Sequence, residues 1–538
     1  MRTKKALPFF FLCTFASTAY VATSACGSSD FSSADDGDAS VVNGSCDTSQ
    51  TPSQTSCVIN EAYGVFVATT ATAAGADGTR AHPFATLQAG ITSAKTQQKR
   101  VYACVGTYAE QITIADGVSV FGNLDCAHDW APITQHALLK APTSPAVRAD
   151  QIQSPTRIDS LDIDAPDGTP ASKNSIGVIA TASPGLTIAN ATIQAGAGFD
   201  GIGGVEGAQL VQSSDGNGAG SGSGGVAYNA ALSPHPDLSV CPGYRPLPSA
   251  SCLPNTASGG TTSCVAPADA GVDAAPFQPG VGGTGGAGGE CSLTDTCTTG
   301  VGAGVMEVAC CTDTPAAGGA PSGNAPIAGT NGRNAVGIWS GTTYVSGDGV
   351  GGTDGSPGQG GAGGGGIDPF LLDYGTTHKA AGYIGQGISG SGGGSGGCPG
   401  LAGTFGTGGG ASIAIVTDSA IILDTCVVKS GNGGRAGQGT FGSAPTSGGG
   451  GGPPIDPPTG GSGPPGSGKS GSAGGTSGWS GNGGAGPSYA IASHGAAPVL
   501  KNTTSQAGIG GKGVPQRTLG AKTIPATPDG SAAPSTTF

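Results

Sequence analysis

The sequence predicts an all-β protein whose short parallel strands stack as successive coils of a solenoid. Three similar segments of 24, 22 and 23 residues begin at Ser175, Ser412 and Ser488. Each segment consists of an apolar strand, a turn of small residues, a second strand and a glycine turn. These lengths match one coil of a β-solenoid, and the alternation within each strand sends every second side chain into a narrow core.

The repeats also match one another at their turns. Residues 190–198 (NATIQAGAG) and 502–510 (NTTSQAGIG) are identical at six of nine positions. Asparagine side chains at equivalent turns can stack from coil to coil, so we expect Asn190 and Asn502 to form such a ladder. A fourth and more degraded copy is expected at residues 334–349.

A short helix is expected to cap the first coil. In PFATLQAGITSA, residues 83–94, the apolar residues Phe84, Leu87 and Ile91 lie at positions i, i+3 and i+7. This spacing places them on one face of a helix, where they would shield the open end of the core.

Motifs between residues 60 and 130 indicate a more specific fold. They are a Gly-Thr turn, a Pro-Phe-x-Thr-Leu-Gln cap, a V-Y-x-x-x-G-T-Y coil and a G-V-x-x-x-G coil. The matching residues are Asp77, Gly78, Thr79, Pro83, Phe84, Thr86, Leu87, Gln88, Val101, Tyr102, Gly106, Thr107, Tyr108, Gly117, Val118 and Gly122. Together they resemble the bacterial right-handed parallel β-helix domains of the pectin-lyase-like class. The resemblance implies a right-handed parallel β-helix with an N-terminal capping helix and long glycine-rich loop insertions.

Glycine accounts for 105 of the 538 residues and is concentrated between the apolar segments. In composition these tracts resemble the polymorphic glycine-rich (PGRS) proteins, although no PE-type N-terminal helix pair is present. Residues 448–486 contain 18 glycines without a strict third-position period, which excludes collagen. We therefore expect loops inserted between coils, and these are either flexible or packed in a polyproline-like manner.

The first 25 residues have the layout of a secretory signal, with a basic start, a short apolar stretch and TSA before Cys26. A small residue before cysteine resembles the lipobox of bacterial lipoproteins, in which Cys26 becomes the acylated N-terminus. That family prefers leucine where Thr23 stands, and ordinary cleavage after Ala25 is the alternative. The resemblance implies a lipid anchor in a membrane and a location at the outer membrane or cell surface.

The charge balance argues against nucleic acid as a partner. The chain has 21 Lys and Arg against 34 Asp and Glu, a formal charge of −13. Removal of the signal leaves 18 basic residues and a charge of −16. No basic stripe remains that could neutralise phosphates.

Fifteen cysteines in an exported chain predict disulfide bonds. Loss of Cys13 with the signal and lipidation of Cys26 leave 13, so at least one thiol is free or bonded to another molecule. Cys104 and Cys126 are one coil apart, and stacked coils bring such positions to about 5 Å, within disulfide reach. Two further cysteines are expected to close a local bridge. They are Cys291 and Cys297.

Candidate catalytic residues lie in RIDSLDIDAPDG, residues 157–168. Asp162 and Asp164 alternate with apolar residues, so both carboxylates leave one strand face, and Arg157 is close in sequence. We favour a solvated outer face, because the six histidines are scattered and no Gly-His-Gly or Arg-x-Lys pairing occurs. No cofactor is expected; a single glycine- and aspartate-rich stretch at 346–355 leaves calcium as the open alternative.

We therefore expect a non-catalytic cell-surface lipoprotein that displays glycine-rich loops on a β-helix, with envelope polysaccharide or another cell surface as its partner. The alternative is a polysaccharide lyase or carbohydrate-binding protein of the pectin-lyase class, with Asp162, Asp164 and Arg157 at its site. The expected organisation is a signal peptide (1–25), a flexible tether (26–60), N-terminal coils (61–212), a Gly/Cys-rich insertion (213–330), further coils with glycine-rich loops (331–515) and a C-terminal tail (516–538).

Overall fold

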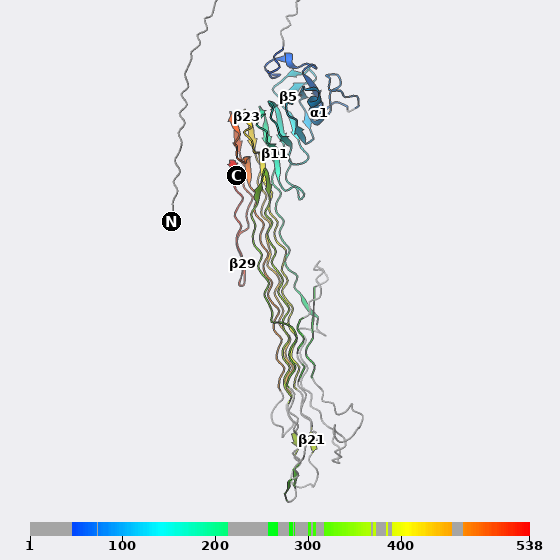
Figure 1. Cartoon of the computed structure of the whole chain (residues 1–538), viewed down its shortest axis with the longest axis vertical. Helices are drawn as coiled ribbons and strands as arrows, with labels where there is room; N and C mark the ends of the chain where they lie inside the picture. Colours follow the sequence, from blue (N-terminus) through cyan, green and yellow to red (C-terminus); the bar gives the residue numbers. More distant parts are fainter. Residues whose placement is uncertain are drawn as a thin grey trace, which may run out of the picture. The chain divides into compact units, whose positions relative to one another are not determined.

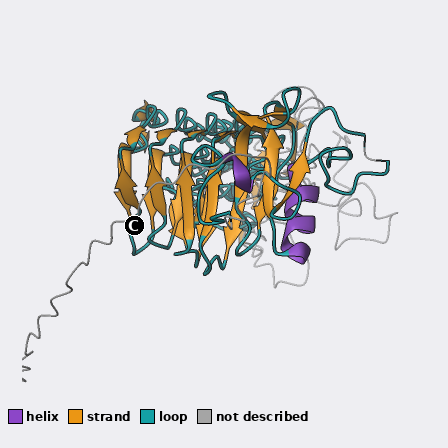
Figure 2. Cartoon of the chain, turned by 90° about the horizontal axis from the view of Figure 1, so that it is seen from above, coloured by secondary structure: helices purple, strands orange, loops and turns teal. Residues whose placement is uncertain are grey.

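The computed structural model shows a predominantly β chain with three parallel sheets (Figures 1 and 2). Within the described residues, helix is limited to η1 (Ser56–Val58) and α1 (Leu87–Gln97). The structure describes residues 46–72, 74–213, 257–266, 279–282, 284–285, 300–302, 305–307, 317–366, 370–372, 383–385, 390–454 and 466–538.

Every strand of the three large sheets pairs in parallel with its neighbours, except β6, which lies antiparallel to β5. Sheet A contains β1 (Gly64–Val67), β2 (Arg100–Cys104), β5 (Val120–Asp125), β6 (Ala131–Pro132), β9 (Thr156–Asp159), β12 (Leu186–Ala189), β23 (Ile422–Asp424) and β26 (Val499–Lys501). Sheet B contains β3 (Thr107–Tyr108), β7 (Ala137–Lys140), β10 (Leu161–Asp164), β13 (Thr192–Gln194), β24 (Val427–Lys429) and β27 (Thr504–Gln506). Sheet C contains β4 (Ile112–Ile114), β8 (Val147–Asp150), β11 (Ser175–Thr181), β22 (Ser412–Thr417), β25 (Ser488–Ser493) and β30 (Ala532–Thr537).

The chain visits the sheets in the cyclic order C, A, B. The three predicted repeats supply β11–β12–β13, β22–β23–β24 and β25–β26–β27, and each strand pairs with its equivalent in the next repeat. The all-β class and the parallel pairing of the repeats are therefore confirmed, and the topology is compatible with a parallel β-helix. The remaining strands form five antiparallel pairs among the described residues. They are β14 (Val211–Ser213) with β15 (Ser263–Val265), β16 (Gly300–Gly302) with β17 (Val305–Glu307), β18 (Ile338–Ser340) with β19 (Thr343–Val345), β20 (Phe370–Leu372) with β21 (Tyr383–Gly385), and β28 (Arg517–Leu519) with β29 (Lys522–Ile524).

One continuous apolar core lies between the three sheets. In sheet A, for example, Ile158, Ile188 and Leu423 stack in register on successive strands and are fully buried. Sheet B contributes a similar column that includes Ile163 and Ile193. The two-residue alternation of these strands is what places one apolar column inward from each sheet.

Helix α1 covers this core as predicted, although it begins at Leu87 and not before Phe84. Leu87 and Ile91 are buried in the core, and Phe84 packs against it from the preceding segment. Thr86 is the N-cap, and its hydroxyl accepts a bond from the Ala89 N–H. The Glu110 carboxylate accepts bonds from the two amides before it, those of Leu87 (2.7 Å) and Gln88 (3.0 Å), so the first three amides of the helix are hydrogen-bonded to side chains.

The turn from sheet A to sheet B is one or two residues long and contains one residue with positive φ in four successive coils: Ser160, Asn190, Thr425 and Asn502. Left-handed backbone is tolerated best by glycine and asparagine, which explains the asparagines at this turn. The predicted ladder between Asn190 and Asn502 is wrong, because the coil that carries Thr425 lies between them. Asn190 instead donates a hydrogen bond to Asp159.

The predicted fourth repeat at 334–349 is also wrong. These residues form the antiparallel hairpin β18–β19 and contribute no strand to the three sheets. Trp339 and Tyr344 of the hairpin pack on apolar residues of the outer face of sheet C, and Trp339 stacks on Phe538 at 3.7 Å. The alternating residues do form a strand pair, but this pair covers a sheet instead of extending one.

The glycine-rich segments all leave the coils at one corner, where sheet B passes to sheet C. In the early coils this connection is short, for example residues 141–146 between β7 and β8. In the later coils it is long: 195–411 between β13 and β22, and 430–487 between β24 and β25. The segments that leave and return run side by side (Figure 1).

Hydrogen bonds join these segments at steps of three residues. Gly355, Gly358, Gly361 and Gly364 donate to the carbonyl oxygens of Gly400, Gly397, Gly394 and Ser391, in that order. A repeat of three residues per turn, with bonds between segments, is that of polyproline II. Of the two expected states of the glycine-rich tracts, the structure therefore shows the polyproline-like packing wherever these residues are described. We call the set of segments 196–209, 317–336, 347–366, 390–411, 430–454 and 466–487 the glycine bundle.

A three-residue glycine period is present after all, but it is interrupted. Glycine occupies every third position from Gly394 to Gly409. In the segment that returns to β25 it runs from Gly468 to Gly474, shifts by one residue, and resumes at Gly475. The shift explains why no strict period was apparent in 448–486.

Candidate functional site

The predicted carboxylates lie on the outer face of sheet B. Asp162 and Asp164 alternate along β10 with two core residues, and both are partly exposed. Asp162 Oδ1 accepts the Thr192 N–H at 2.7 Å and lies 3.2 Å from His136 Nδ1. His136 was not singled out in the sequence, because it is 26 residues away from Asp162 and only the coil brings the two together.

Arg157 does not join this pair. It lies on β9 in sheet A, and its Nε donates to Asp159 Oδ2 at 2.6 Å. The same carboxylate accepts bonds from Ser160 and Asn190, so Asp159 holds the turn between the two sheets. The predicted trio is therefore not brought together: Arg157 forms an ion pair with Asp159, and Asp162 contacts His136. Among the described residues, Asp164 has no salt-bridge partner.

The aspartates of the calcium-like stretch 346–355 hold the glycine bundle. Asp348 Oδ1 accepts the Gly408 N–H at 2.7 Å and pairs with Lys173 Nζ at 2.9 Å. Asp354 Oδ1 accepts the Ala402 N–H at 2.7 Å. Both aspartates therefore bond to the same neighbouring segment, 390–411. Across the described ranges, no cluster of three or more His, Cys, Asp or Glu side chains is arranged to hold a metal ion.

The structure places Cys104 and Cys126, the pair expected from the coil spacing, in a disulfide with Cα atoms 5.6 Å apart. A second disulfide joins Cys264 of β15 to Cys398 of the glycine bundle, 134 residues apart. Cys426 is a free and buried thiol, and burial raises its pKa, which disfavours the reactive thiolate. Three further predicted residues lie outside the described residues. They are Cys26, Cys291 and Cys297.

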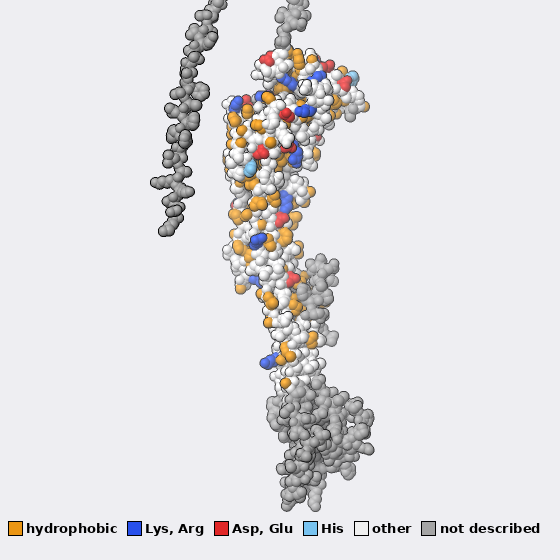
Figure 3. Space-filling view, viewed as in Figure 1, with side chains coloured by type: hydrophobic (Ala, Val, Ile, Leu, Met, Phe, Trp, Pro, Cys, Tyr) orange, Lys and Arg blue, Asp and Glu red, His pale blue; other side chains and the backbone are white. Residues whose placement is uncertain are grey.

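Charged side chains are sparse over the glycine bundle compared with the coils (Figure 3). The contact between the bundle and the hairpin β28–β29 is an exception. Lys522 Nζ donates to Ser477 Oγ at 3.1 Å, and burial lowers the pKa of this lysine. Arg517 donates to the Gly439 carbonyl and lies over the Phe441 ring. These contacts dock the hairpin on the bundle.

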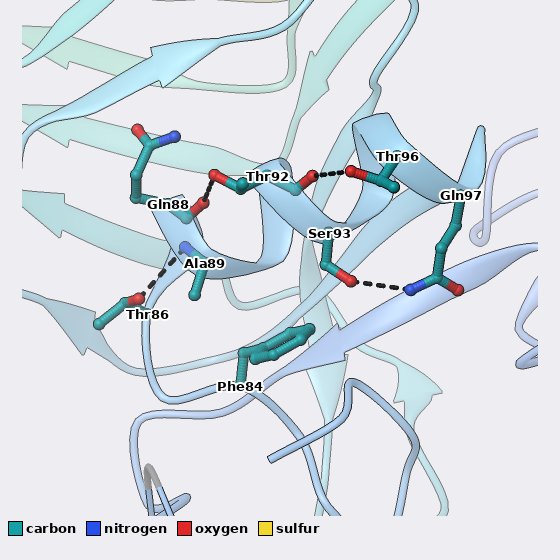
Figure 4. Close-up of a pocket in the computed structure, with 8 residues that line it drawn as sticks. All are labelled: Phe84, Thr86, Gln88, Ala89, Thr92, Ser93, Thr96 and Gln97. Atoms are coloured by element: carbon teal, nitrogen blue, oxygen red, sulfur yellow. Dashed lines mark hydrogen bonds between the residues drawn. The ribbon is translucent and has the colours of Figure 1, made fainter.

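A hollow lies on the solvent side of α1 (Figure 4). It is an open depression of about 570 Å³ without a charged side chain in its lining. One face of α1 is buried in the core. The opposite, polar face, which lines the depression, is therefore fixed relative to the coils. The lining residues are Phe84, Thr86, Gln88, Ala89, Thr92, Ser93, Thr96 and Gln97.

Comparison with known proteins found no matching family model, no similar curated protein and no similar solved structure. In the described part of the chain, no helix has the length and apolar character to cross a bilayer.

Proposed function

We propose that this protein is a non-catalytic cell-surface lipoprotein, built on a right-handed parallel β-helix of the pectin-lyase-like class, that presents the glycine bundle for adhesion or envelope interaction. The cyclic order of the sheets supports the β-helix, and the motifs of residues 60–130 support the class. The observation that carries the functional proposal is the place at which the glycine-rich segments leave the coils. All of them leave at one corner and bond to one another, so the coils hold them as a single unit.

The interior of the bundle leaves little room for catalysis. A Cβ atom built on Gly397 would lie 2.2 Å from the Thr446 carbonyl oxygen, and one on Gly400 would lie 2.4 Å from that of Ser443. Backbones packed this closely exclude functional side chains from the interior. What the bundle offers to a partner is its outer surface, which carries small and polar side chains together with exposed apolar ones. The exposed apolar residues are Ile202, Val205, Ile327, Val336, Val350 and Phe405.

Anchoring through Cys26 is tested on the full chain expressed in a bacterial host. We expect the wild-type protein in the membrane fraction, with a lipidated Cys26 as the first residue by mass spectrometry and with protease cleavage on intact cells. The matched variant Cys26→Ala removes the acylation site and should release the chain to a soluble fraction. An unmodified N-terminus on a soluble wild-type protein would refute the anchor.

The second candidate is a polysaccharide lyase or carbohydrate-binding protein, which the pairing of His136 with Asp162 favours, since a carboxylate orients a histidine for proton transfer. We expect the mature chain to show no turnover of polygalacturonate with calcium, because Arg157 is engaged by Asp159. Release of unsaturated products, followed by their ultraviolet absorbance, would contradict this. If such activity disappears in Asp162→Asn but persists in Asp167→Asn, the enzyme is the better reading.

A further inference from the structure

The depression on α1 is lined by hydroxyl and amide side chains that retain hydrogen-bond donors and acceptors for a ligand. Thr92 Oγ1 donates to the Gln88 carbonyl (2.8 Å) and Thr96 Oγ1 to the Thr92 carbonyl (3.2 Å), so both retain lone pairs for a ligand. Ser93 Oγ accepts from Gln97 Nε2 (2.8 Å), which leaves the serine O–H as a donor. These four side chains are shown together in Figure 4.

The remaining lining adds to this pattern. Thr86 Oγ1 accepts from the Ala89 N–H, and among the described residues its own proton has no protein acceptor. Gln88 Oε1 accepts the Thr113 N–H at 2.7 Å, which fixes the amide and leaves its NH2 group as a donor. The ring of Phe84 lies beside the helix face that carries Ala89 and Ser93, and it provides an apolar surface (Figure 4).

We infer that the depression on α1 binds a neutral, hydroxyl-rich chain, that is, a segment of an uncharged polysaccharide. Each sugar hydroxyl both donates and accepts, as the mixed hydroxyl and amide lining requires, and the C–H face of a sugar packs on an aromatic ring. The lining holds no Asp, Glu, Lys, Arg or His to pair with a charged ligand. Its open form suits a polymer that passes across the helix, whereas small-molecule sites enclose their ligands.

The depression on α1 lies outside the glycine bundle and would give the chain a second contact with an envelope polymer; only this biological setting rests on the proposed function. The measurement is saturation-transfer NMR on the mature chain with three probes: cellohexaose, maltohexaose and hexagalacturonate. We expect transfer to at least one neutral hexasaccharide in the millimolar range and weaker transfer to hexagalacturonate. No transfer to either neutral probe would overturn the inference.

The site is tested with the double variant Thr92→Val/Thr96→Val, which keeps the side-chain shape and removes both hydroxyls. We expect at least a five-fold loss of transfer, roughly what the loss of one ligand hydrogen bond costs. The matched control is Thr187→Val/Thr504→Val, which removes two hydroxyls from the outer faces of sheets A and B. Equal transfer in wild type and the α1 variant would overturn the inference.

Circular dichroism and thermal unfolding of each variant separate lost binding from lost folding, because α1 caps the core. If the valine variant has a folding defect, the test moves to Ser93→Ala. Ser93 lies on the solvent side of the helix, and its replacement removes one donor. Unchanged transfer in this variant would then overturn the site. A wild-type chain that is lipidated and surface-exposed but shows no transfer to either neutral probe would overturn only this inference. Binding without lipidation would overturn only the anchor.

Discussion

Replacement of Cys264 and Cys398 by alanine is expected to destabilise the glycine bundle by about 2–5 kcal/mol. The disulfide closes a loop of 134 residues. In the chain-entropy model a cross-link over a loop of this length restricts the unfolded chain by on the order of 5 kcal/mol. Both cysteines are also buried with Leu210 and Leu401, so the bond joins β15 to the bundle inside a small apolar cluster.

The effect should appear in denaturant unfolding of the oxidised protein followed by tryptophan fluorescence. Trp130→Phe and Trp339→Phe in every variant leave Trp479, which lies in the bundle, as the only tryptophan. The matched control is the double alanine variant of Cys104 and Cys126, whose loop is only 22 residues long. Its chain-entropy contribution is smaller, about 3 kcal/mol, and it lies among the N-terminal coils. An unfolding midpoint of the bundle that is unchanged without the Cys264–Cys398 bond would contradict the assigned role.

Gly204→Ala is expected to destabilise the bundle by about 2 kcal/mol or more, at the upper end of typical overpacking costs. A Cβ atom at this position would lie 2.1 Å from the Thr404 carbonyl oxygen, and its nearest neighbours are backbone atoms that cannot turn away. The Gly204 N–H donates to the Gln438 carbonyl at 2.8 Å, so a displaced segment also loses this bond.

The adjacent Gly203→Ala is the matched control, because a Cβ atom there would lie 3.7 Å from its nearest neighbour. We expect this variant to be neutral or more stable by up to about 1 kcal/mol, since alanine restricts the unfolded chain. Hydrogen exchange of peptides covering 401–410 measures both effects locally, because the amides of Thr404 and Thr407 donate to the neighbouring segment 196–209. Equal exchange rates in the two variants would show that the bundle is not closely packed at this position.

The local elements of this protein can be predicted from the order of its residues. Two-residue alternation located the strands of the three repeats, because a strand with one face in a core must alternate. The spacing of Leu87 and Ile91 located the capping helix, since those side chains share one helical face. The disulfide between Cys104 and Cys126 could be predicted because the two residues are one coil apart, and stacked coils have a nearly fixed length. All of these depend on contacts within one coil or between adjacent coils.

Which distant segments meet could not be predicted in this way and depends on the folded arrangement of the coils. Nothing local in glycine tracts specifies a partner, since each backbone N–H can bond to any carbonyl, and the corner from which the segments leave selects their neighbours. For the same reason the Cys264–Cys398 pair and the His136–Asp162 contact were missed. Residues 334–349 show the limit most clearly: their alternation predicts two strands, but whether these extend a sheet or cover one depends on Trp339 and Tyr344 finding an apolar outer face on sheet C.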